Sequence, residues 1–372
     1  MTRAHLTLAA LFVLGIVSMA CGNHAVPETS GTPKAAITSR EVTFEVKGLT
    51  LSGTLQLPGA RLSPESSRNS DTSSYQRDIS PAPALLLLPG SGPTDRDGNS
   101  SVLTEKVDLL KQIAEELAKN GIASLRFDKR AIRTYQAKWP KDMAAINQFF
   151  SWPNFVDDAS TAFDFLAKQP EIDPARVGIL GHSEGALISL QIDSDRSGKS
   201  NAPRATILLG GTGRPMGIVI HEQISRLLKK QQAPADVAKT YIDYTDAACA
   251  ALAAGKPLPP NTPQGLVTLF NPSVLDIVGA YCRIDPVNLA KKSGGDFLVM
   301  NGAHDTQVSA DRDTPLLVAA LKGRSGGTVD SLIIPDASHN LKSTASGNDD
   351  ATAGPMNLAA LNKIIEFAKK SL

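Results

Sequence analysis

The sequence predicts an α/β fold with a mostly parallel central sheet, helices on both faces and a helical insertion. Short, unbroken apolar runs alternate with longer amphipathic stretches, which is typical of a parallel sheet covered on both faces. The chain has 372 residues, of which 42% are hydrophobic and 20% charged, so it can bury a large core. One apolar run ends in a serine between two glycines, within VGILGHSEGALISL at residues 177–190.

The charge balance argues against a polyanionic partner. The formal net charge of +1 comes from 38 basic and 37 acidic residues that are well mixed along the chain. Proteins that bind nucleic acids usually carry a basic patch or stripe. The charges of this chain are mixed, so we expect no nucleic-acid partner.

Residues 1–20 are predicted to be a signal peptide. A basic start precedes an apolar run at residues 6–20, which is shorter than the roughly 20 residues that a membrane-spanning helix needs. Cys21 follows directly and resembles the lipidated cysteine of bacterial lipoproteins, although Ser18 stands where they usually have an aliphatic residue. The alternative is ordinary cleavage with a free Cys21. The expected location is exported: periplasmic or membrane-anchored through an N-terminal lipid, otherwise secreted.

The first part of the mature chain is predicted to be a tether followed by a hairpin. Residues 21–40 are rich in Pro, Thr, Ser and Gly and lack periodicity, so we expect a flexible tether. Residues 41–59 alternate and are β-branched, which predicts two antiparallel strands that turn at Lys47 and Gly48. Residues 61–80 have little to bury and predict an exposed loop.

The regular alternation follows and fixes the domain boundaries. Strands are predicted at 84–88, 122–127, 177–180, 205–209, 296–300 and 331–335. Helices are predicted at 101–121, 155–169, 313–323 and 356–372. The core therefore consists of residues 41–213 and 294–372.

Residues 214–293 are predicted to be a helical cap insertion, because a crossover between neighbouring strands needs far fewer residues. Cys249 and Cys282 both fall in it. An oxidising compartment permits a disulfide between them, and two buried free thiols fit the sequence equally well.

Ser183 is the predicted nucleophile. It stands where a strand turns sharply into a helix, and Gly181 and Gly185 relieve the crowding at that corner. A strained backbone there exposes the hydroxyl, and the helix N-terminus favours a developing oxyanion.

The order of chemical groups along the chain selects the base and the acid. In hydrolases with this strand-serine-helix corner, the acid and then the histidine follow the serine. His5, His24, His182, His221 and His304 are each excluded by position, which leaves His339 after the last predicted strand. Asp305 follows a strand end on the same edge and is the expected acid. Asp311 and Asp313 are explained by helix capping, and Asp336 lies too close to the histidine in sequence.

The oxyanion hole is predicted to use two backbone N–H groups, those of Glu184 and Ser91, with Gly92 as the alternative to Ser91. The loop that carries Ser91 continues through Asp95, Arg96 and Asp97. Support of this loop is the favoured role for those three residues, ahead of contact with substrate.

Several motifs together resemble a group of bacterial α/β-hydrolase fold esterases, related to the serine aminopeptidase-like and dienelactone-hydrolase-like branches. They are PGSGPTDRDGN, LRFDKR, GHSEGA, YCRIDPVNLAKK, NGAHDTQVS and SHNLK, within residues 41–372. The sequence departs from the group at residues 128–142, where relatives usually have a glycine soon after the arginine. The resemblance implies the α/β-hydrolase fold, a helical cap and a triad of Ser183, Asp305 and His339.

The expected function is a serine carboxylesterase that acts on small to medium carboxylic esters through an acyl-enzyme on Ser183. The expected partner is a small-molecule ester, with no metal and no cofactor, and the cap is expected to cover the site and shape its pocket. The alternatives are a peptidase of the same fold and a non-catalytic binding lipoprotein on a hydrolase scaffold, which predicts missing triad members.

Overall fold

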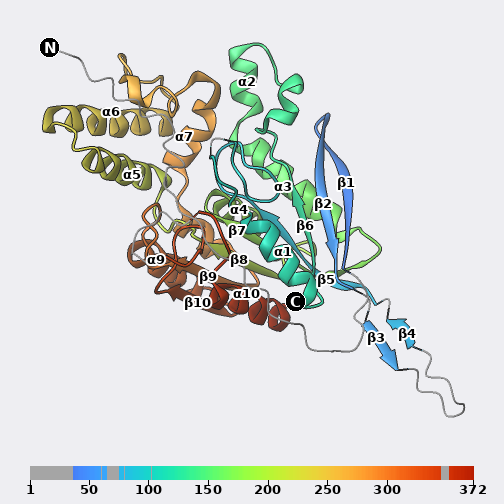
Figure 1. Ribbon diagram of the computed structural model, residues 1–372. Coiled ribbons are helices and arrows are strands. Elements are labelled where there is room, and N and C mark those ends of the chain that lie inside the picture. The colour runs from blue at the N-terminus through green and yellow to red at the C-terminus, as the bar shows by residue number, and fades with distance from the viewer. Residues whose placement is uncertain (1–36, 60, 65–74, 79, 102, 345–351) are drawn as a thin grey trace, which may run out of the picture.

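The computed structural model describes residues 37–59, 61–64, 75–78, 80–101, 103–344 and 352–372 (Figure 1). The predicted signal peptide, Cys21 and the rest of the predicted tether up to residue 36 lie outside these residues.

An eight-stranded sheet forms the centre of the molecule, in the order β1-β2-β6-β5-β7-β8-β9-β10. Its strands are β1 (Thr38–Val46), β2 (Leu49–Leu57), β5 (Ala82–Leu88), β6 (Ala123–Phe127), β7 (Ile172–His182), β8 (Ala205–Leu209), β9 (Asp296–Gly302) and β10 (Val329–Ile334). The contacts β1–β2 and β2–β6 are antiparallel and all the others are parallel. The predicted mostly parallel sheet is therefore confirmed, together with the hairpin turn at Lys47 and Gly48.

The structure differs from two predictions in the first part of the chain. β1 begins at Thr38, inside the predicted tether of residues 21–40, and its first residues pair with β2 while their side chains stay exposed. Within residues 61–80, the structure has a second, two-stranded sheet of β3 (Arg61–Pro64) and β4 (Tyr75–Asp78) instead of a loop only. Strand pairing here uses backbone groups, so composition and burial patterns did not reveal it.

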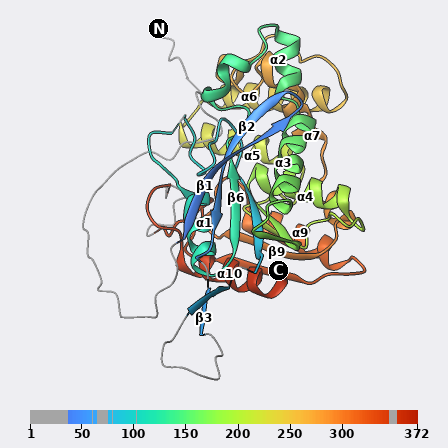
Figure 2. The ribbon, with the colours of Figure 1, turned by 90° about the vertical axis from the view of Figure 1, so that its right-hand side faces the viewer.

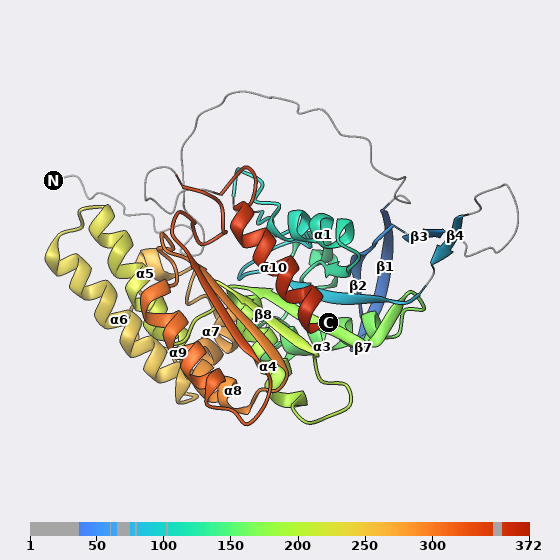
Figure 3. The same ribbon diagram turned by 90° about the horizontal axis from the view of Figure 1, so that it is seen from below.

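Helices cover both faces of the central sheet, as Figure 3 shows from below. One face carries α1 (Leu109–Lys119) and α10 (Leu358–Ser371); the other carries α3 (Trp152–Ala167), α4 (Glu184–Arg196), α8 (Pro286–Lys292) and α9 (Ala310–Lys322). Alternate residues of β5 pack on opposite faces of the sheet. Leu85 packs with α1 and α10, whereas Leu86 packs in the hydrophobic cluster on the other face, which includes residues of α3.

The predicted insertion contains the cap helices α5 (Met216–Lys230), α6 (Ala235–Ala253) and α7 (Leu275–Arg283). They gather with α2 (Met143–Phe149) at one end of the sheet (Figures 1 and 2). Short 3-10 helices lie at Arg133–Lys138, Gln264–Leu266 and Pro272–Val274. α8 also falls within residues 214–293, yet it packs against α4 and α9 of the core.

The structure joins Cys249 on α6 to Cys282 on α7 by a disulfide, so the cap has a covalent link between two of its helices. Within the described part of the chain, no helix combines the length and apolar character needed to cross a membrane.

Candidate active site

Ser183 occupies the corner between β7 and α4, with a backbone φ of 55° and ψ of −115°. This positive φ is costly for a residue with a side chain and is characteristic of strained functional corners. The flanking glycines are required by close packing: a Cβ on Gly181 would lie 2.0 Å from the Gly185 carbonyl oxygen, and one on Gly185 would lie 2.4 Å from that of Leu88. The local sequence thus holds Ser183 at the sheet edge, partly exposed.

Three strands deliver the predicted triad to the same edge of the sheet. Ser183 follows β7, Asp305 follows β9 and His339 follows β10, and these strands are all parallel. Nδ1 of His339 lies 2.7 Å from Oδ2 of Asp305, and both side chains are buried. The other carboxylate oxygen of Asp305 accepts hydrogen bonds from the backbone N–H groups of Gln307 and Val308, at 2.7 and 2.8 Å. The acid is therefore fixed at both oxygens, and it orients the imidazole ring of His339 through Nδ1.

Ser183 and His339 line one pocket, whose empty space is about 450 Å³ with the open solvent above it included. Its other lining residues are Gly90, Ser91, Thr94, Gly98, Ser100, Leu103, Val107, His182, Gln307 and Asn340. Among these described residues there is no Asp, Glu, Lys or Arg. The described wall of the pocket therefore offers hydroxyl, amide and apolar groups, and histidine is the only titratable side chain in this described part.

The two predicted oxyanion donors lie beside the nucleophile. Glu184 is the first residue of α4, where a backbone N–H has no acceptor within the helix. Ser91 lines the same pocket as Ser183, whereas the alternative donor Gly92 is not among its lining residues. The roles of these two N–H groups as oxyanion donors stay predictions.

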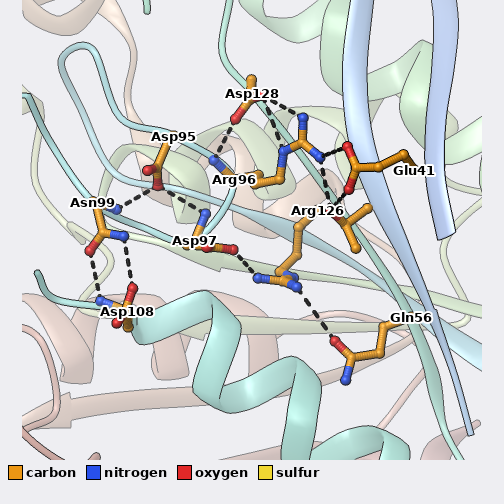
Figure 4. Close-up of polar contacts among 10 residues, drawn as sticks. Glu41, Gln56, Asp95, Arg96, Asp97, Asn99, Asp108, Arg126 and Asp128 are labelled. Atoms are coloured by element: carbon orange, nitrogen blue, oxygen red, sulfur yellow. Dashed lines mark hydrogen bonds and ion pairs between the residues drawn. The ribbon is translucent and has the colours of Figure 1, made fainter. Parts of the chain in front are cut away.

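A polar network holds the loop that carries Ser91 (Figure 4). Arg96 binds Asp128 through Nε and Nη2, at 3.1 and 2.6 Å. Asp97 pairs with Arg126 on β6, and Asp95 accepts hydrogen bonds from the backbone of Asp97 and of Asn99. The charged residues of TDRDGN therefore contact the protein itself, in agreement with the loop-support role favoured from the sequence.

Replacing Arg96 by Met is expected to lower the free energy of unfolding by about 2–3 kcal/mol, because it leaves a largely buried Asp128 carboxylate without its partner. Urea denaturation measures the change. Arg40→Met is the matched control, since the Arg40–Glu171 pair has side chains that are 47% and 37% exposed and should contribute less than about 1 kcal/mol. Equal losses in the two variants would contradict a special role for the network.

His182 contacts both the backbone and the ring of His339. Its Nε2 lies 3.0 Å from the carbonyl oxygen of His339, and the two ring centroids are 4.7 Å apart. Burial, with a smaller contribution from nearby His339, lowers the pKa of His182 to about 3. The ring is therefore neutral at physiological pH and donates its Nε2–H to that carbonyl.

This pKa predicts that the His182→Phe variant loses less stability in acid than the wild type. The pKa of His182 is lower in the folded chain (about 3) than its ordinary value of 6.5, so the unfolded state binds more protons between these pH values. Stability is thus lost as the pH falls below 6.5. Between neutral pH and about pH 4, the wild type should lose about 3 kcal/mol more than the variant. Parallel curves of unfolding free energy against pH would contradict this.

Other candidate residues have structural partners. His221 pairs with Asp246 at 2.8 Å, and Nδ1 of His304 lies 2.6 Å from the Thr344 hydroxyl. Asp313 does not cap its helix as predicted: its buried carboxylate binds the side chain and backbone N–H of Arg214 at the start of the insertion. His5 and His24 lie outside the described residues. Across the residues that the structure describes, no group of three His, Cys, Asp or Glu side chains is arranged to hold a metal ion.

The sequence did not predict a cluster of three buried side chains near the corner at Ser183: Lys129, Glu184 and Tyr281. Lys129 donates to the Glu184 carboxylate at 2.6 Å and to the Gly90 carbonyl at 3.0 Å, and the Tyr281 hydroxyl donates to Glu184 as well. All three occur in the motifs that carry the family resemblance. The one signal in the sequence was a lysine two residues after the end of the buried strand β6, and this signal does not reveal the partners of the lysine.

The cap contacts residues next to the site. Among the described residues that line the pocket, none comes from the predicted insertion, residues 214–293. Tyr281 on α7 contacts Glu184, and Gln223 on α5 donates to the backbone carbonyl of Gln307 at 3.1 Å. The expectation that the cap covers the site and shapes its pocket stays a prediction.

Comparison with known proteins gives a distant sequence relative and a shared fold. No known family model matches the chain. It is 25% identical over 303 residues to the esterase EstD of Thermotoga maritima, covering 80% of this chain and 60% of that protein. The chain thus spans about 60% of the length of this relative.

Two solved structures resemble it over 90% of this chain. The acylaminoacyl peptidase of Pyrococcus horikoshii matches with a TM-score of 0.52 and 16% identity over 42% of its own chain. The 2,6-dihydroxy-pseudo-oxynicotine hydrolase matches with a TM-score of 0.51 and 12% identity over 68% of its chain. At these identities the similarity establishes the fold, and the predicted α/β-hydrolase fold is confirmed.

Proposed function

We propose that the chain is a serine carboxylesterase that cleaves small to medium, uncharged carboxylic esters through an acyl-enzyme on Ser183. The observation that carries this proposal is the meeting of a strained, glycine-flanked Ser183 and the buried Asp305–His339 pair at one pocket. The sequence similarity to the esterase EstD supports the same activity.

The proposed reaction has two halves, acylation of Ser183 and hydrolysis of the acyl-enzyme. Oγ of Ser183 attacks the ester carbonyl while Nε2 of His339 takes its proton, and the N–H groups of Ser91 and Glu184 stabilise the oxyanion. The imidazolium then protonates the departing alcohol. Water then gives a proton to His339 and attacks the acyl-enzyme, the bond between the acyl group and Oγ of Ser183 breaks, and the imidazolium returns the proton to Oγ as the carboxylic acid leaves. Asp305 holds the imidazole in its productive tautomer throughout.

The pocket favours esters over peptides with a free amino terminus. Recognition of an ammonium group calls for a carboxylate or another acceptor with negative charge. The described lining of the pocket contains no acidic side chain, and its Leu103 and Val107 offer apolar surface. This composition suits a neutral acyl or alcohol group.

We also propose that the protein is exported and lipidated at Cys21, on the basis of the N-terminal sequence described above. Metabolic labelling with a palmitate analogue should mark the wild type and not the Cys21→Ala variant. Equal labelling, or retention of both in the cytoplasm, would contradict this part of the proposal.

The activity is tested with a panel of p-nitrophenyl esters of increasing acyl length, compared with aminoacyl anilides. We expect ester hydrolysis with a higher kcat/KM than anilide hydrolysis. A fluorophosphonate probe should label the wild type and leave Ser183→Ala unlabelled. Faster anilide turnover would favour the peptidase alternative. Absence of both turnover and labelling would favour the non-catalytic binding protein.

A further inference from the structure

Lys129 is a buried cation that contacts both parts of the chain that carry the predicted oxyanion donors, namely those at Ser91 and at Glu184. Its side chain is 4% exposed and follows directly on β6 and Asp128. Its Nζ donates to the carbonyl oxygen of Gly90 at 3.0 Å and to Oε1 of Glu184 at 2.6 Å, and it lies 4.9 Å from the ring centroid of Phe155. The ammonium group thus has a carbonyl, a carboxylate and an aromatic face around it, which match its three N–H donors.

The bond to Gly90 determines where the Ser91 N–H points. The carbonyl of Gly90 and the N–H of Ser91 belong to one planar trans peptide unit, in which the two groups point in opposite directions. Because Lys129 holds the oxygen, the N–H is directed away from it, and Ser91 lines the pocket. The positive charge also polarises this peptide and strengthens the N–H as a donor.

The same lysine fixes the second donor through Glu184. The side chain of Glu184 is 1% exposed and paired with Lys129, while its own backbone N–H opens α4 next to Ser183. Its other carboxylate oxygen accepts the hydroxyl hydrogen of Tyr281 from α7 of the cap. Burial, followed by the nearby Glu184 charge, raises the pKa of Tyr281 well above its usual value, so the hydroxyl stays protonated and remains a donor.

We propose that Lys129 is a positioning residue that aligns both oxyanion N–H groups through Gly90 and Glu184, and that Tyr281 ties this alignment to the cap. The inference rests on the proposed esterase function and adds a role for residues outside the triad. It predicts that the cluster acts on the transition state more than on substrate binding.

The test removes both charges together, because a single substitution would leave one buried charge unpaired. In the double variant Lys129→Met, Glu184→Gln, kcat for p-nitrophenyl acetate should fall about 10–100-fold while KM changes less than about threefold. Affinity for a trifluoromethyl ketone, which forms a tetrahedral adduct on serine, should fall by a similar factor.

The matched control is the neighbouring pair in Arg130→Met, Asp158→Asn. Its side chains are 4% and 2% exposed and lie 2.6 Å apart, so it reproduces the loss of a buried ion pair. It contacts neither Gly90 nor Glu184, and kcat should stay within about threefold of the wild type. Circular dichroism verifies that each variant is folded at the assay temperature.

Tyr281→Phe is the milder second variant, because it deletes one hydroxyl and keeps the ring beside Trp152. We expect kcat to fall about three- to tenfold with KM unchanged. An unchanged kcat in this variant would overturn the link to the cap. An unchanged kcat in the Lys129/Glu184 variant, a loss confined to KM, or an equal loss in the control would overturn the positioning role. A wild type that neither hydrolyses esters nor reacts with fluorophosphonate would instead refute the esterase function itself.

Discussion

Asp305→Asn is expected to lower kcat about 10⁴-fold while the protein stays folded. In the structure Oδ1 of Asp305 accepts the N–H groups of Gln307 and Val308. An asparagine would keep its oxygen on these donors and turn its NH₂ group toward Nδ1 of His339. That nitrogen would then accept a hydrogen bond, and the proton would move to Nε2, the atom that must take the proton from Ser183.

Steady-state kinetics with a p-nitrophenyl ester measure this loss, and KM should change little. Asp336→Asn is the matched control: it lies in the loop that leads to His339, and its carboxylate accepts one hydrogen bond from Asn357. The control should keep kcat within about twofold of the wild type. If Asp305→Asn retained more than about a tenth of the activity, another group would have to orient His339.

Gly181→Ala is expected to lower the free energy of unfolding by more than about 4 kcal/mol, or to prevent soluble expression. Its Cβ would lie 2.0 Å from the carbonyl oxygen of Gly185 and 2.5 Å from Oγ of Ser189. The first of these is a backbone atom in α4, so relief requires α4 to move away from the end of β7. Such a shift would displace Ser183 as well.

Thermal and urea denaturation measure the loss of stability. Gly326→Ala is the control, because no atom beyond its two chain neighbours lies within 4 Å of the position of its Cβ and its φ is not in the left-handed region. The control should change the free energy of unfolding by less than about 1 kcal/mol. A Gly181→Ala variant as stable as this control would mean that the corner tolerates a wider turn than the structure shows.

The sequence predicted the parts of the fold that bury apolar residues. β8 occupies the predicted residues 205–209, and the other strands of the parallel part overlap their predictions, because each of them contains a short apolar run. The helix predicted at 101–121 starts only at Leu109, since Asp108 takes a left-handed conformation and its N–H binds the side chain of Asn99. Such local hydrogen bonds compete with helix formation and leave no trace in the hydrophobic pattern.

The candidate site was likewise predictable from the sequence only in part. The chain order of acid and histidine, together with parallel strand ends, was enough to bring Asp305 and His339 to one edge, where the structure has them 2.7 Å apart. The partners of Lys129 were not predictable, because Gly90, Glu184 and Tyr281 come from separate elements. Their meeting depends on how α7 packs against the core, which no local pattern encodes.

The disulfide between Cys249 and Cys282 has a practical consequence for any biochemical study of this protein. Cys282 is the residue after Tyr281, so the bond secures the same turn of α7 that contacts Glu184. Protein produced in a reducing bacterial cytoplasm would lack this cross-link, and a preparation could then mix oxidised and reduced molecules. Counting free sulfhydryls with Ellman's reagent under denaturing conditions, before each assay, would make rates from different batches comparable.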